Sequence, residues 1–79
     1  SELSKLRWHC RRGMKELDVM LSRYLDDYYP TAPESERATF HVLLELADPL
    51  LYAYFLGNQT PEDEQIAALI RKIRGFFEL

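Results

Sequence analysis

Apolar residues recur at the spacing of an α-helix along almost the whole chain, and no segment keeps the strict alternation that is typical of a half-buried strand. Each such helix must bury its apolar stripe against another element. The pattern therefore predicts an all-α protein, a single small bundle of about five helices. Because 79 residues can form one compact core but not two, we expect one domain that covers residues 1–79.

Residues that start and stop helices divide the chain into these segments. Proline and glycine end helices, and a hydroxyl or carboxylate side chain can cap the free amides at a helix start. The expected starts are Ser1 or Ser4, the segment after Gly13, a capping box at Thr31–Glu34, Asp48-Pro49 and Thr60-Pro61. The expected ends are Gly13, Pro30, Asp48, Gly57 and Gly75.

The side chains expected in the core share the faces of these helices. They are Leu3, Leu6, Cys10, Leu17, Met20 or Leu21, Tyr24, Leu25, Tyr28, Phe40, Leu43, Leu44, Ala47, Leu51, Tyr52, Tyr54, Phe55, Ile66, Leu69, Ile70 and Ile73. Phe76 and Phe77 are expected to fold back on the bundle. The helix from residue 49 to Gly57 is apolar nearly all round, which indicates central burial.

Composition argues against several classes of protein. A net charge of −3 does not favour a general nucleic-acid binder held by phosphate contacts. The longest apolar run, residues 50–56, is far shorter than the ~20 residues that cross a bilayer, and no signal-peptide core is visible. We therefore expect no membrane span and a cytoplasmic location. Cys10 is the only cysteine, so no internal disulfide can form, and a reducing compartment fits.

The sequence offers no catalytic or metal-binding constellation. His9 and His41 lack partners at the spacing of a helical metal site, so we expect no metal. Neighbouring helical residues point about 100° apart, so His9 cannot activate Cys10, which is expected to be a buried small residue. The three glycines are isolated and form no phosphate loop. We expect no catalytic residue and no flavin or nucleotide bound stably by this chain.

Gly13 lies in a basic segment that self-stabilisation explains poorly. Glycine inside a continuing helix costs up to about 1 kcal/mol relative to alanine. In that case Arg12 and Glu16, four residues apart, would flank bare backbone in a notch that admits another chain. Alternatively, Gly13 is the C-cap of the first helix. Both alternatives stay open. The cations of the first third form a candidate contact surface: Lys5, Arg7, Arg11, Arg12, Lys15 and Arg23.

Two segments resemble a known family. The stretch R-W-H-C-R-R-G-M-K-E-L-D, residues 7–18, has an R-G-x-x-E core and resembles the signature of the SdhE family, also called Sdh5-type proteins and, in older naming, CptB antitoxins. The stretch L-L-E-x-x-D-P at residues 43–49, with the aromatic-rich segment after it, resembles the second block of that family. The similarity covers nearly the whole chain. Leu50 and Tyr54 depart from the acidic residue and the tryptophan that the family often has.

The resemblance implies a five-helix factor, not an enzyme, that binds the flavoprotein subunit of succinate dehydrogenase, and that of fumarate reductase, and promotes covalent attachment of FAD to a histidine there. The short chain is similar to bacterial members, and we expect a monomer. The partner-binding residues would be Arg12, Gly13 and Glu16, extended by Arg11, Trp8 and Lys15. Asp48 is a weaker candidate because helix capping explains it. The alternative is an antitoxin or regulatory adaptor that uses the same surface on another protein.

Overall fold

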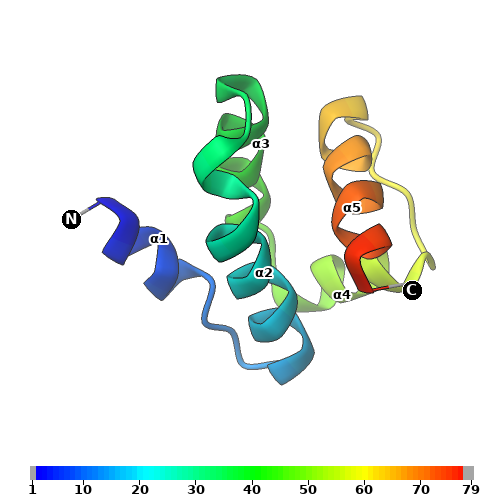
Figure 1. Ribbon diagram of the computed structural model, residues 1–79. Coiled ribbons are helices and arrows are strands. Elements are labelled where there is room, and N and C mark those ends of the chain that lie inside the picture. Colours follow the sequence, from blue (N-terminus) through cyan, green and yellow to red (C-terminus); the bar gives the residue numbers. More distant parts are fainter. Residues whose placement is uncertain (1, 78–79) are drawn as a thin grey trace.

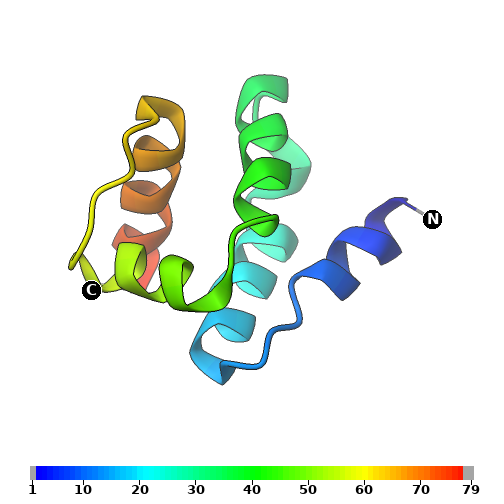
Figure 2. The ribbon, with the colours of Figure 1, turned by 180° about the vertical axis from the view of Figure 1, so that it is seen from behind.

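The computed structural model describes residues 2–77, and this part of the chain is all α, as predicted. Five α-helices follow one another, with one 3₁₀ turn, η1, after the second: α1 (Glu2–His9), α2 (Lys15–Asp27), η1 (Tyr29–Thr31), α3 (Glu34–Leu44), α4 (Asp48–Leu56) and α5 (Glu64–Phe77). Helix α5 packs against α3 and α4, and α2 contacts α1, α4 and α5. Figures 1 and 2 show α4 crossing one end of the bundle between α3 and α5, while α1 projects to the side.

The core follows the predicted helix faces closely. Helix α2 buries every residue of its predicted stripe from 17 to 25, so Met20 and Leu21 are both inside. The fully buried side chains of the other helices include Phe40, Leu43, Leu51, Phe55 and Ile73. Two predicted core residues are wrong. Leu3 is 48% exposed because α1 is short and turns only Leu6 inward, and Ala47 is exposed because α3 ends three residues before it.

Several residues predicted for the core, most of them aromatic, pack at its edge and not in its centre. Tyr28, Tyr52, Tyr54 and Ile66 are partly buried against the core cluster. The prediction that Phe76 and Phe77 return to the bundle is confirmed. The ring of Phe76 stacks on that of Tyr28, with centroids 3.7 Å apart. The central burial predicted for α4 holds only for Leu51 and Phe55.

The predicted helix ends are less accurate than the predicted faces. Gly57 closes α4 as expected, with a φ of 82° in the left-handed region. Gly75 does not end α5, which continues to Phe77. The capping box is wrong, since Thr31 ends η1 and α3 begins behind Pro33 without a side-chain cap.

The cap of α5 lies at another residue than predicted. Asp63, not Thr60, caps α5, because its Oδ1 accepts the N–H groups of Gln65 and Ile66 at 2.9 and 3.1 Å. At the N-terminus, Ser4 lies inside α1, and Ser1 lies outside the described residues.

Two glycines give opposite predictions for stability. Gly57→Ala should lower the free energy of unfolding by about 1 to 2 kcal/mol, because alanine is strained at this positive φ. Its Cβ would also lie 3.1 Å from the Arg74 guanidinium. Gly75→Ala should raise stability by about 0.5 to 1 kcal/mol, since Gly75 is helical and a Cβ there meets none of the described residues within 4 Å. Urea unfolding of the two variants beside the wild type measures both effects. Equal effects at both positions would contradict this account.

Candidate protein-docking surface

The connection between α1 and α2, residues 10–14, holds Gly13 outside any helix. Helix α1 ends at His9, and Met14 is the N-cap of α2, whose carbonyl accepts the N–H groups of Leu17 and Asp18. Both interpretations of Gly13 are therefore wrong. It is not part of a continuing helix, and it is not a left-handed C-cap, because Gly57 is the positive-φ glycine among the described residues. Arg12 and Glu16 consequently do not share a helix.

Arg12 points into the protein and not toward solvent. Its guanidinium donates hydrogen bonds to the carbonyl oxygens of Leu44 and Leu46, the latter at 3.4 Å. It also lies 3.3 Å from a carboxylate oxygen of Asp48, in an ion pair where its side chain is 14% exposed. The backbone N–H of Arg12 donates to the carboxylate of Asp18. The open notch flanked by Arg12 and Glu16, expected for a continuing helix, is thus not what this arrangement provides.

Asp48 is the residue whose role the sequence interpretation missed. It was expected to cap α4, but Ala47 is the N-cap there, and no side chain supplies the cap bond. One oxygen of the Asp48 carboxylate pairs with Arg12, and the other accepts the N–H of Gly13 at 3.2 Å. The resemblance to a D-P block was the one signal that could have pointed to this residue.

Gly13 itself is exposed, with little of its own protein beside it. Among the described residues, a Cβ built on Gly13 would lie 3.8 Å from Asp48 Oδ2, an ordinary van der Waals contact, and nearer to nothing else outside its chain neighbours. The described bundle therefore has room for a side chain at this position. Its own packing does not require a glycine here.

The other predicted contact residues stand on both sides of Gly13 and reach solvent. Trp8 is 68% exposed, and the Arg11 guanidinium lies 5.3 Å from the centroid of its ring, a cation–π contact. Lys15 and Glu16 are exposed in the first turn of α2. Among residues 2–77, Glu16 forms no salt bridge, so its carboxylate is available to a partner's donors.

Residues just before and just after Gly13 in the chain line two hollows that differ in character. One, of about 310 Å³, is polar and is lined by Trp8, His9, Arg11, Arg12, Leu44 and Glu45. The other, of about 430 Å³, is mostly apolar and is lined by Lys15, Glu16, Val19, Met20 and Phe77. Sequence reasoning missed the second hollow, because it combines α2 with the far end of α5. An apolar patch inside a charged rim is the usual anatomy of a protein interface.

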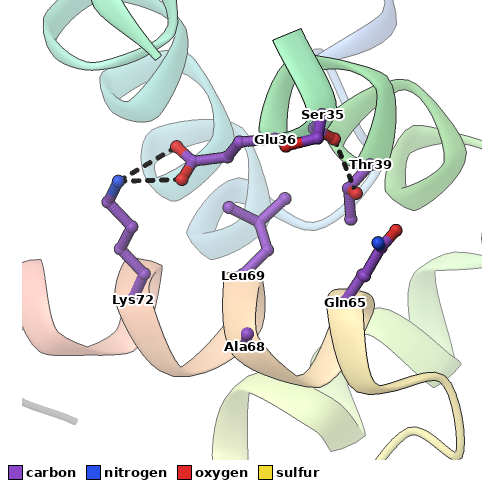
Figure 3. A pocket seen from close by; sticks show the side chains of 7 residues that line it. All are labelled: Ser35, Glu36, Thr39, Gln65, Ala68, Leu69 and Lys72. Atoms are coloured by element: carbon purple, nitrogen blue, oxygen red, sulfur yellow. Dashed lines mark hydrogen bonds and ion pairs between the residues drawn. The ribbon is translucent and has the colours of Figure 1, made fainter. Parts of the chain in front are cut away.

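A third cavity, of about 250 Å³, lies between α3 and α5 and is part of the scaffold (Figure 3). Glu36 accepts hydrogen bonds from Lys72, at 2.9 and 3.0 Å, and from the Tyr24 hydroxyl at 2.5 Å. Burial opposes the charge on Glu36, but the bonds from Tyr24 and Lys72 outweigh it and lower the pKa of Glu36. This network joins α2, α3 and α5, and its carboxylate, ammonium and hydroxyl groups bond to one another.

Cys10 is a structural residue, as expected. It is fully buried, and this burial raises the pKa of its thiol to about 11, so the thiol is neutral and a poor nucleophile. In the described range, no group of three or more histidine, cysteine, aspartate or glutamate side chains is placed to hold a metal ion. None of the described helices is both long and apolar enough to cross a bilayer.

Comparison with known proteins identifies the family. The family model described as "Flavinator of succinate dehydrogenase", Sdh5, matches residues 4–77. Relatives named FAD assembly factor SdhE include one from Coxiella burnetii, which is 44% identical over 89% of this chain and 85% of its own length. The protein of the same name from Methylococcus capsulatus is 45% identical over 94% of this chain and 89% of its own length. That from Idiomarina loihiensis is 46% identical over 85% of this chain and 74% of its own length. The chain therefore belongs to the Sdh5 family, the flavinators of succinate dehydrogenase.

Proposed function

We propose that this protein binds the flavoprotein subunit of succinate dehydrogenase, and that of fumarate reductase, and promotes covalent attachment of FAD to it. It acts as a monomer in the bacterial cytoplasm. The observation that carries this proposal is membership of the flavinator family over residues 4–77, together with close relatives that are named FAD assembly factors. The antitoxin alternative has no comparable support.

The geometry supports docking more than chemistry. The Gly13 backbone is exposed, and residues just before and just after it in the chain line a polar and an apolar hollow. A partner segment that approaches Gly13 closely can therefore place side chains in these hollows. We call the exposed Gly13 backbone the docking seat. Exposed side chains near it in the chain supply charges and one large aromatic ring, namely those of Arg11, Trp8, Lys15 and Glu16. Clusters of this kind, an aromatic and an arginine around a close contact, supply most of the energy in many interfaces.

The factor would accelerate flavinylation without forming or breaking bonds itself. On binding, it favours the conformation of the flavoprotein in which that subunit's histidine and its bound FAD are aligned for reaction. FAD stays with the flavoprotein throughout, and this chain holds none of it stably. The hollows beside Gly13 serve the partner's side chains.

The test measures covalent flavin on the flavoprotein subunit in bacterial cells that lack the factor. In-gel flavin fluorescence of the denatured subunit should be weak in these cells and should return when the wild-type chain is expressed. Affinity purification of the tagged chain should recover the flavoprotein subunit. Unchanged fluorescence without the factor, or recovery of an unrelated stable partner in place of the flavoprotein, would refute the proposal.

A further inference from the structure

We infer that Arg12 and Asp48 are positioning residues, which hold the Gly13 backbone in the shape that the flavoprotein binds, and that Arg12 does not contact the partner. The inference rests on the proposed function. It assigns the two segments of the family resemblance, R-G-x-x-E and D-P, to one structural unit. We call this unit the Gly13 clamp: Arg12, Gly13, Asp18, Asp48 and the carbonyls of Leu44 and Leu46.

Both terminal nitrogens of the Arg12 guanidinium already donate inside the protein. Together they reach two carbonyls and one carboxylate, a geometry that suits a planar fork with several N–H groups. The Nε is buried without a hydrogen-bond partner, so it is also out of a docking partner's reach. The guanidinium could turn toward a partner only by breaking these three bonds.

The carbonyls that accept from Arg12 belong to the α3–α4 turn, where they need hydrogen-bond donors from outside the helix. Helix α3 ends at Leu44 and α4 begins at Asp48, so carbonyls at the end of α3 have no partner within the helix. Arg12 satisfies the carbonyl of Leu44 and that of Leu46 in the same turn. The α1–α2 connection and the α3–α4 turn are thereby fastened to each other, although 32 residues separate Arg12 from Leu44.

Two carboxylates then fix two successive amides of the connection. Asp18 accepts the N–H of Arg12, and Asp48 accepts the N–H of Gly13 at 3.2 Å. With both amides held from the inside, the free face of Gly13 stays turned to solvent. A binding segment that is held in shape before contact loses less conformational freedom on binding, so its affinity is higher. Asp48 therefore acts on the partner through Gly13, without touching it.

The first arm of the test follows the clamp in the free protein. Arg12→Lys keeps the charge but replaces the planar fork, whose two terminal nitrogens reach three spread acceptors, with a single ammonium nitrogen. Asp48→Asn offers one acceptor oxygen where Asp48 uses two. In amide-resolved NMR, both variants should shift the Gly13 signal and speed its hydrogen exchange, while the signals of Gly57 and Gly75 stay in place. The matched control is Arg71→Lys, which changes an arginine that pairs with Glu64 and lies outside the proposed docking surface.

The second arm measures docking and flavinylation with the isolated flavoprotein subunit, under conditions in which circular dichroism shows every variant folded. Arg12→Lys and Asp48→Asn should each bind roughly tenfold more weakly, yet reach the wild-type maximal flavinylation rate at saturating factor. The double variant should bind no worse than the weaker single one, because both changes open the same clamp.

Each result decides for or against the clamp. Wild-type affinity in Arg12→Lys, or weaker affinity with an unmoved Gly13 signal, would overturn the inference, the latter because Arg12 would then act on the partner directly. The NMR arm needs no partner. If wild-type chain fails to bind the flavoprotein, the proposed function fails, and this arm still reports whether the clamp exists.

Discussion

Gly13→Arg is expected to abolish support of flavinylation while leaving the protein folded. The position is exposed, and a Cβ there meets only Asp48 at ordinary contact distance, so the bundle itself tolerates a side chain. A partner that lies against the bare backbone does not. An arginine side chain at this position should cost at least about 2 kcal/mol of binding free energy, which is roughly a thirtyfold loss in affinity. Flavin fluorescence of the complemented cells and the binding constant of the purified variant measure the effect.

Matched variants separate this effect from damage to the fold. Gly75→Arg makes the same substitution at another exposed glycine, where a Cβ meets nothing within 4 Å in the described part of the chain, and it should leave binding unchanged. Gly13→Ala should melt within a few degrees of the wild type and bind with intermediate affinity, because a methyl group fills less of the seat. If Gly13→Arg binds the flavoprotein as tightly as the wild type, the docking surface lies elsewhere on the bundle.

The helix faces could be predicted from the sequence because burial sets them locally. In α2 and α5 the apolar stripe repeats every three or four residues, and the structure buries that stripe. The helix ends could be predicted less well. A cap is one hydrogen bond among several that a polar side chain can make, and the Asp48 carboxylate accepts the N–H of Gly13 and not an amide of its own helix. Gly75 stays helical because Phe76, beyond it, stacks on Tyr28.

The exposure of most candidate site residues could be predicted from the sequence, but the hydrogen bonds around them could not. The exposed positions of Trp8, Arg11, Lys15 and Glu16 agree with a surface role, which no contact here tests further. The inward turn of Arg12 could not be read from its neighbours, since its acceptors lie 32 to 36 residues away in the chain. A sequence motif indicates which residues are important for function. The tertiary hydrogen bonds determine whether such a residue contacts the partner itself or positions another residue that does.

Phe40→Ala should destabilise the protein more than any surface change. Phe40 is fully buried, and the centroid of its ring lies 4.7 Å from that of Tyr24 and 5.7 Å from that of Tyr29. Removing the ring leaves a cavity where α2, η1 and α3 meet, at a cost of about 3 to 5 kcal/mol. A domain of this length has roughly 4 to 12 kcal/mol in all, so a large part of its stability should disappear. Thermal and urea unfolding measure the loss.

The same variant shows how loss of the fold differs from loss of docking. Val42→Ala, on the same helix but at a 52% exposed residue, should change stability by less than about 0.5 kcal/mol and serves as the control. In cells, Phe40→Ala should lower flavinylation through a smaller folded population, so lower growth temperature or higher expression should restore it. Gly13→Arg should respond far less to lower growth temperature, because its molecules are already folded and bind the flavoprotein too weakly. Equal rescue of both variants at the lower temperature would mean that Gly13 also serves stability, and the docking account of this position would then be wrong.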